Sequence, residues 1–505
     1  MIKLIYRIES DYMSKKRMLI VTSVTLSVVT ISLGIVKLYQ TYALSNYIGT
    51  VTDTGIDVYI NDDSYASIPA NGSSNVYYML TNTNPGTVKY GVAYQTTSGV
   101  TVKVYDTSED PATGTIEEND KKYIKLHLEN KNSTNKTIEL STVLGYENGG
   151  DLVVPSGVTL VTDTYTPPPT AAEYITKLYT TASKTTVTNN SITYNTAPSV
   201  SLMNDRLGGT TTDLDGGNIR YYGASPNNYI YFNCSDYSNQ TSSTCETWRI
   251  IGVFNGKLKI IRGSQIGTYS WDNKDTSTGA ESNFGKNDWT TARLMKLLNP
   301  SDYYTTDSND NNLGQGLYYN SASGKCYSGQ NNATVDCNFT STGIKNDITR
   351  NMIAETTYNL GGWNTNKIYS NQIYEYERGT TVYTGRPTTP WTGKIALAYP
   401  SDYGYAADLN QCKQTLYNYD NSTCTSNNWM KAIITNNGSN DGWLLTPYSS
   451  DSYDVWHVHS SGFVNYHGNA YTAYGAVPVL SLSSELGIKS GLGDGSSSNP
   501  YKLSA

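Results

Sequence analysis

Three of the four histidines in the chain lie within residues 449–474. The same stretch is rich in Tyr, Ser, Asn and Asp, which combine rigid aromatic contact area with adaptable hydrogen bonds. This chemistry is typical of a protein surface that binds a ligand. The candidate ligand-binding residues are Ser449, Asp451, Tyr453, Asp454, Trp456, His457, His459, Asn465, Tyr466, His467, Asn469, Tyr471 and Tyr474.

Strand alternation predicts that His457 and His459 share one face, while Trp456 and Val458 are available to pack. Trp456 fits surface contact as well as packing. Two histidines at this spacing, with His467 nearby, are also typical of zinc ligands, and Asp451 or Asp454 could complete the set. The sequence does not mark either carboxylate as a zinc ligand, so we expect neither a metal ion nor another cofactor.

The spacing of the six cysteines indicates the cellular compartment of the protein. They fall as Cys234/Cys245, Cys326/Cys337 and Cys412/Cys424, each pair 11 or 12 residues apart, and no CxxC zinc spacing is present. The equal local spacing favours three disulfides between neighbours, although other pairings stay open. Disulfides persist in oxidising compartments, so we expect an extracytoplasmic protein.

An uncharged apolar run at residues 19–36 is long enough to cross a bilayer as a helix. It follows a cluster of basic residues, which predicts a cytoplasmic N-terminus. We therefore expect residues 1–45 to be a cytoplasmic tail and a single-pass anchor in the cell membrane, with the C-terminal part outside. The alternative is a signal peptide cleaved near residues 41–43.

Short β-patterned runs fill residues 52–165, at 56–60, 75–80, 88–94, 100–105, 123–128 and 137–144. Their spacing predicts an immunoglobulin-like β-sandwich that serves as a stalk. Residues 166–170 (TPPPT) follow and predict a semi-rigid linker. The net charge of −7 over 505 residues, with no basic run after the N-terminal segment, argues against nucleic acid as a partner.

The remaining residues, 171–505, predict a second, larger domain. A helix is expected from Ala171 to about Leu178 and another from Asp288 through Leu298. Strands at 248–254 and 257–261 flank Asn255-Gly256, a strong hairpin signal, and a strand at 229–234 precedes them. The stretches around 301–345 and 364–390 are polar and are expected to be loops.

The C-terminal segment contains WLLTP at residues 443–447 and PVLSL at 478–482. With WRIIGV at 248–253 and YPSDYGY at 399–405, this frame resembles bacterial surface proteins with a C-type-lectin-like fold, related to formylglycine-generating enzymes and to the variable proteins of diversity-generating retroelements. The resemblance covers residues 171–505. The chain has Val477 where such proteins carry Arg. The resemblance implies that the polar stretch between the two frames faces the ligand.

The resemblance also implies two alternatives. Asparagine codons mutated at adenine give the residue types found at 449–474, so this stretch could be diversified, although the whole chain is rich in the same types. Formylglycine-generating enzymes use a late cysteine pair, and Cys412/Cys424 is the late pair here. It lacks a basic neighbourhood that would activate a thiol, which favours a structural disulfide. An inert cell-surface scaffold is a third reading.

Together these features predict a mainly β protein with an N-terminal transmembrane helix, an immunoglobulin-like β-sandwich and an α+β C-type-lectin-like domain. We expect a binder of a cell-surface or extracellular protein or glycan rather than an enzyme.

Overall fold

The computed structural model describes residues 65–83, 85–146, 152–207, 213–273, 284–305, 313–379, 390–489 and 491–504, and the backbone of 40–43, 381–383 and 386–387. The protein is mainly β. It divides into two compact units, Met1–Pro167 and Pro168–Ala505, so the division falls within the run of three prolines. The predicted anchor at residues 19–36 lies outside the described residues. Among those that are described, no helix is long and apolar enough to span a membrane.

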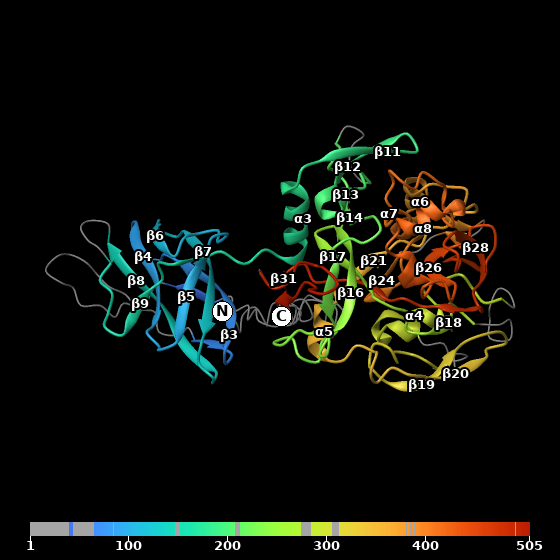
Figure 1. The fold of residues 1–505 in the computed structure, drawn as a ribbon. Coiled ribbons are helices and arrows are strands. Elements are labelled where there is room, and N and C mark those ends of the chain that lie inside the picture. Colours follow the sequence, from blue (N-terminus) through green and yellow to red (C-terminus); the bar gives the residue numbers. More distant parts are fainter. Residues whose placement is uncertain are drawn as a thin grey trace. The chain divides into compact units, whose positions relative to one another are not determined.

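The first unit consists of two β-sheets (Figure 1). One has the order β1 (Gln40–Ala43), β3 (Gly72–Thr81), β7 (Lys121–Asn130), β5 (Val100–Tyr105) and β10 (Thr164–Tyr165). The other has the order β2 (Tyr65–Ile68), β8 (Lys136–Tyr146), β4 (Val88–Gln95) and β6 (Thr113–Ile116), with β9 (Val158–Leu160) beside β4.

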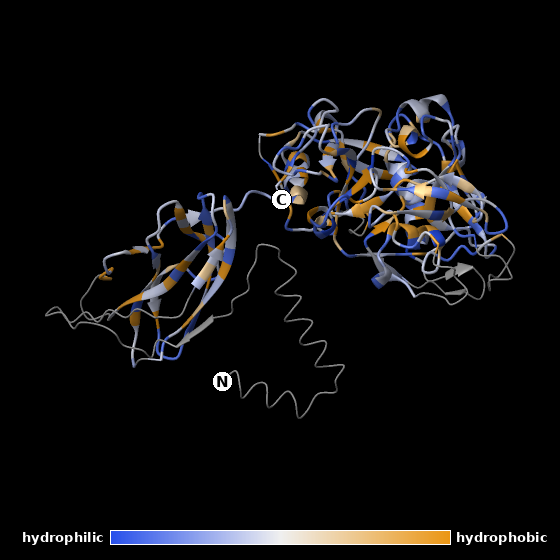
Figure 2. Ribbon diagram, turned by 90° about the horizontal axis from the view of Figure 1, so that it is seen from below, coloured by the Kyte–Doolittle hydropathy of each residue, from blue (hydrophilic) through white to orange (hydrophobic). Residues whose placement is uncertain are grey.

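Alternating side chains of both sheets form one core, which includes Val76, Leu126, Val92 and Leu140. Figure 2 shows hydrophobic and hydrophilic residues alternating along these strands. This period-two pattern buries one face of each sheet against the other. The predicted strands from 75–80 onward are confirmed, whereas the run at 56–60 lies outside the described residues.

The second unit begins with α3 (Ala171–Thr181). Thr170 caps this helix in a capping box: its hydroxyl accepts a hydrogen bond from the Glu173 backbone N–H, and its own N–H donates to the Glu173 carboxylate at 2.8 Å. Ile175 and Tyr179 are buried on one face. The predicted helix is therefore confirmed and continues for three residues beyond Leu178.

A large sheet runs through the second unit. Its order is β11 (Thr185–Asn189), β12 (Ile192–Ala197), β13 (Leu202–Asn204), β14 (Ile219–Tyr221), β16 (Glu246–Phe254), β17 (Lys257–Arg262), β30 (Val479–Ser481) and β25 (Ile395–Ala396), and β15 (Tyr229–Phe232) also pairs with β16. The predicted hairpin is confirmed: Asn255 and Gly256 both have positive φ, 49° and 71°, as a tight two-residue turn requires. Gly252 lies at a bulge where a Cβ would stand 2.1 Å from the Ile219 carbonyl oxygen.

A second sheet carries the C-terminal frame. Its order is β18 (Thr268–Ser270), β29 (Ala473–Gly475), β26 (Gly442–Pro447), β27 (Asp454–Val458) and β28 (Val464–Asn469). Leu445 and Val455 belong to one hydrophobic cluster, whereas Leu444 and Trp456 belong to another. The inner strands of this sheet are therefore covered on both faces.

The remaining elements are short. The α-helices are α4 (Arg293–Leu298), α5 (Asp347–Met352), α6 (Ser370–Glu377), α7 (Pro400–Tyr405), α8 (Ser422–Ser426) and α9 (Lys431–Ile434). The paired strands are β19 (Ser323–Tyr327) with β20 (Thr334–Asn338), β21 (Thr356–Tyr358) with β24 (Trp391–Gly393), β22 (Thr381–Tyr383) with β23 (Arg386–Pro387), and β31 (Gly487–Ile488) with β32 (Leu503–Ser504).

Two local predictions were partly wrong, although the second helix ends at Leu298 as expected. The helix expected from Asp288 begins only at Arg293, because the Asp288 carboxylate accepts hydrogen bonds from the backbone N–H and hydroxyl of Thr290 and so closes a turn instead. The stretches expected to be loops contain the β19–β20 hairpin and α6. Many residues of these elements are exposed and polar, so the sequence lacks the apolar periodicity that predicts a strand or a helix.

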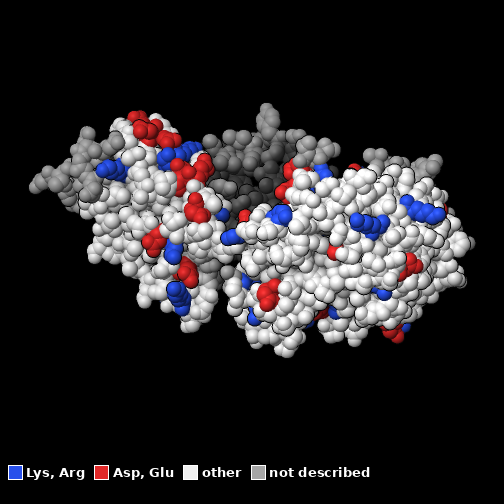
Figure 3. Space-filling view, turned by 45° about the horizontal axis from the view of Figure 1, so that its top comes forward, with Lys and Arg blue, Asp and Glu red and all other residues white. Residues whose placement is uncertain are grey.

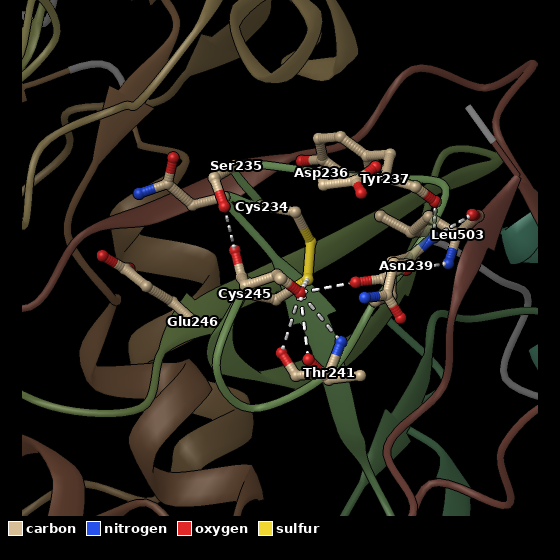
Figure 4. The surroundings of a disulfide bond; sticks show 12 residues. Cys234, Ser235, Asp236, Tyr237, Asn239, Thr241, Cys245, Glu246 and Leu503 are labelled. Carbon is tan, nitrogen blue, oxygen red and sulfur yellow. Dashed lines mark hydrogen bonds between the residues drawn. A yellow bond between two sulfur atoms is a disulfide. The ribbon is translucent and has the colours of Figure 1, made fainter.

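The three predicted disulfides are present, as Cys234–Cys245, Cys326–Cys337 and Cys412–Cys424. Figure 4 shows the first one, with Thr241, Asn239 and Leu503 around it. Within the loop that it closes, the Gln240 side chain exchanges two hydrogen bonds with the Leu503 backbone, at 2.6 and 2.8 Å. This disulfide therefore also fixes the C-terminal strand.

A buried network of charges joins the large sheet to α7. The Asp402 carboxylate contacts Arg220 Nη1 at 2.9 Å and Lys259 Nζ at 2.5 Å, and Arg220 Nε contacts Asp205 at 2.5 Å. These four side chains are at most 8% exposed. Burial alone would raise the pKa of Asp402, but Lys259 and Arg220 outweigh it and lower that pKa to about 2. The network contains two cations and two carboxylates, so its charges balance.

We predict that Asp402→Asn destabilises the second unit by about 3–5 kcal/mol, because Lys259 and part of Arg220 would remain buried without a counter-ion. The matched control is Asp336→Asn, which breaks the exposed ion pair with Lys325 and should cost less than about 1 kcal/mol. Urea denaturation of the full chain measures both. Equal losses in the two variants would contradict the role of the network.

Candidate functional site

Residues 449–474 form β27 and β28 at one end of the second sheet, most of β29 on the other side of β26, and the turns between them. Strand β28 is the last strand in the order of that sheet, beside β27. Along it, Asn465 and Tyr466 are half-buried and His467 is exposed. The stretch therefore does present polar and aromatic side chains at the surface.

Stacked rings form the centre of this surface. Tyr448 stacks on Tyr466 with their centroids 4.7 Å apart and their planes at 19°. The His467 ring lies 4.1 Å from Tyr466 and 5.3 Å from Tyr448. A second group contains Phe284, which is 40% exposed and lies 4.9 Å from Tyr453 and 5.8 Å from Tyr471. We call these six residues the aromatic face.

The Asp454 carboxylate binds two polar side chains at the aromatic face, those of His467 and Asn469. It accepts a hydrogen bond from the Asn469 amide at 2.6 Å and lies 3.1 Å from His467 Nδ1. Burial raises its pKa, against the opposing effect of the hydrogen bond with His467. Asp451 supports the turn before it by accepting the backbone N–H groups of Tyr453 and Asp454. The result is a fixed acid–imidazole–amide group beside exposed rings.

Most predicted site residues are at least partly accessible. Those that are half-buried or exposed are Ser449, Asp451, Tyr453, His459, Asn465, Tyr466, His467, Asn469, Tyr471 and Tyr474. The other three are buried: Trp456 fully, His457 with 1% exposed and Asp454 with 5% exposed. Of the two roles open to Trp456 the structure shows packing, and the side chains of His457 and Asp454 do not face solvent, unlike most of the stretch. Because core clusters cover both faces of β27, strand alternation does not separate an inner from an outer face there.

His457 is part of the core. Its ring lies 4.8 Å from Tyr474 and 6.1 Å edge-on from Trp443, and Nε2 is 3.6 Å from the Asp441 carboxylate. Burial lowers the pKa of His457 to about 4, although Asp441 opposes the shift. His459, by contrast, lies just beyond the strand, where its Nδ1 is 2.9 Å from the Ser461 hydroxyl.

The zinc alternative is not assembled. Across the described residues, no group of three or more His, Cys, Asp or Glu side chains is arranged to hold a metal ion. His457 is enclosed by the core, His459 packs on Phe463, and His467 turns to Asp454. Cys412 and Cys424 are joined and buried, so neither presents a thiolate in this oxidised form.

Sequence reasoning missed Tyr448 and Phe284. Tyr448 directly follows the WLLTP segment and lies one residue before the candidate stretch 449–474. Phe284 is one of five phenylalanines in the chain and lies in a polar stretch, which is a signal in itself. Figure 3 shows Lys and Arg scattered among uncharged and acidic side chains on the face in view, without a continuous charged patch there.

No family model, curated protein or solved structure matches the chain.

We predict that His457 makes stability depend on pH. Its folded pKa of about 4 lies below the ordinary 6.5, so the unfolded chain takes up a proton first as the pH falls. The stability that neutral His457 provides is complete above about pH 6.5 and declines between pH 6.5 and 4, by up to about 3 kcal/mol. His457→Gln should flatten this slope.

Denaturant unfolding at a series of pH values measures the slope, with His459→Gln as the control because His459 is partly exposed. An unchanged slope in His457→Gln would contradict the assignment.

Proposed function

We propose that this chain is a membrane-anchored ligand-binding protein of the cell surface, adhesin-like or receptor-like. In this proposal the first unit is an immunoglobulin-like stalk and the second unit is a C-type-lectin-like head. The ligand is an extracellular protein or glycan. The observation that carries the proposal is the partly exposed stack of Tyr448, Tyr466 and His467 beside the Asp454 carboxylate.

The chemistry of the aromatic face supports binding rather than packing alone. Tyrosine offers a large contact area with few rotatable bonds, so little conformational entropy is lost when a ligand covers it. His467 and Asn469 are held by Asp454, which orients their polar groups before a ligand arrives. Exposed rings next to oriented donors and acceptors are the composition expected of binding hot spots.

The disulfides support display outside the cytoplasm, because three such bonds persist in an oxidising compartment. The membrane anchor at residues 19–36 and the diversification of residues 449–474 remain sequence-based parts of the proposal. A template repeat beside a reverse transcriptase gene would support diversification.

We predict that Tyr466→Ala combined with His467→Ala lowers the apparent affinity for ligand by about tenfold or more, because the stack loses two of its three rings. Purified full chain in detergent is first screened on printed glycans and on immobilised extracellular proteins. Each hit is then titrated with wild type and variant.

Tyr65→Ala combined with Tyr123→Ala is the matched control, since both tyrosines are exposed in the first unit, at 57% and 41%. Control binding should equal wild type. Hits that bind the aromatic-face variant as tightly as wild type would place the site elsewhere.

A further inference from the structure

A cavity of about 470 Å³ opens in the second unit, and none of the aromatic-face residues lines it. Side chains of β15, β16 and the α9 region line it, among them Tyr229, Arg249, Trp429 and Ile433. Small-molecule sites usually measure roughly 300–1,000 Å³. The cavity is therefore large enough for a compact ligand.

Arg249 is the unusual group in its wall. Its side chain is 7% exposed, and its guanidinium lies 3.7 Å from the Tyr229 ring and 4.9 Å from the Trp429 ring. Nε donates to the Asn228 side-chain oxygen at 2.5 Å, and Nη2 donates to the Pro226 carbonyl at 3.3 Å. Both partners are neutral. No carboxylate among the described residues pairs with Arg249.

Arg220, on the next strand of the same sheet, provides an internal comparison. It is 1% exposed and has two carboxylate partners, Asp205 and Asp402. A guanidinium withdrawn from water without a counter-ion is costly, and an anion in the cavity would offset that cost. The protein satisfies this requirement internally for Arg220 but not for Arg249.

The other charged groups in the wall define which anion fits. Arg262 Nε contacts the Glu246 carboxylate at 3.0 Å, so these two charges cancel. The cavity wall then has a net charge of +1, from Arg249. A net charge of +1 matches a monoanion. Trp429, Tyr229 and Ile433 provide apolar and flat surfaces for the rest of the ligand.

We propose that this cavity, here called the carboxylate pocket, binds a carboxylate attached to an apolar or aromatic body, with Arg249 as its counter-ion. The planar guanidinium fork matches a carboxylate in two hydrogen bonds. The carboxylate belongs either to a small organic acid or to the C-terminus of a peptide.

The electrostatics agree with this assignment. Burial lowers the pKa of Arg249 to about 10, and interaction with Tyr229 only partly opposes the shift. The charged form is thus held in an environment that disfavours it until an anion enters.

The test is isothermal titration calorimetry of the full chain with N-acetylphenylalanine and with its uncharged amide. We expect saturable binding of the acid and at least about tenfold weaker binding of the amide. A tripeptide ending in phenylalanine, as free acid and as C-terminal amide, distinguishes the two sources. Whichever free acid binds more tightly identifies the source.

Two variants separate binding from folding. Arg249→Gln should weaken binding of the acid by at least about tenfold. Ala432→Glu changes an exposed residue of the pocket wall and should also weaken it, because it adds a negative charge, whereas Ala432→Gln of nearly equal size should not. Thermal unfolding of each variant verifies that it is folded.

Absence of saturable binding by every acid, or equal binding of acid and amide, would overturn the proposal. Tighter binding of inorganic phosphate than of the acids would overturn the carboxylate assignment. Binding that survives both Arg249→Gln and Ala432→Glu would show that the acid binds outside the pocket.

Discussion

The second unit depends on the ion pairs that Asp402 makes in its interior. Asp402 lies on α7, Arg220 on β14 and Lys259 on β17, so one carboxylate joins a helix to two strands of the large sheet. A charge buried in this way is tolerated only while every partner stays in place. Ala398, two residues ahead of α7, extends the linkage, because its carbonyl accepts a hydrogen bond from the Leu445 N–H of β26. The segment that leads into α7 is thus tied to β26, the central strand of the second sheet.

The same principle distinguishes structural charges from those open to a ligand. Glu377 is buried near Asp402, and burial raises its pKa to about 7, although Arg378 and the Ser401 backbone and hydroxyl groups partly offset the effect. Its hydrogen bonds with Ser401 are internal, at 2.9 and 2.6 Å. Arg249 differs because its neutral partners leave the charge uncompensated and because it lines a cavity. Two buried groups with perturbed pKa values thus have different roles, and geometry decides between them.

Much of the local structure could be predicted from the sequence. The Asn255-Gly256 hairpin, the capped helix at Ala171 and the nearby disulfides each depend on residues close together in the chain. The ion network could not be predicted, because Arg220 and Asp402 are 182 residues apart. Alternation failed at β27 for a related reason. Alternation of apolar and polar residues indicates a strand with one solvent-exposed face. Core clusters cover β27 on both faces, so Trp456 and His457 are both buried.

The candidate binding surface shows what composition alone can and cannot indicate. The clustering of His, Tyr and Asn predicted a binding surface in the stretch that forms β28. On this strand Tyr466, His467 and Asn469 are at least partly exposed. Composition could not supply Phe284, which comes from a distant segment and completes a ring group only through folding. Nor could it distinguish Asp454 from Asp451, one of which orients His467 and Asn469 while the other closes a turn. Under the proposed function, a ligand would have to match an arrangement set by the second sheet, and substitutions at Tyr466, His467 and Asn469 of β28 would alter its specificity without disturbing the buried residues that hold the strand in place.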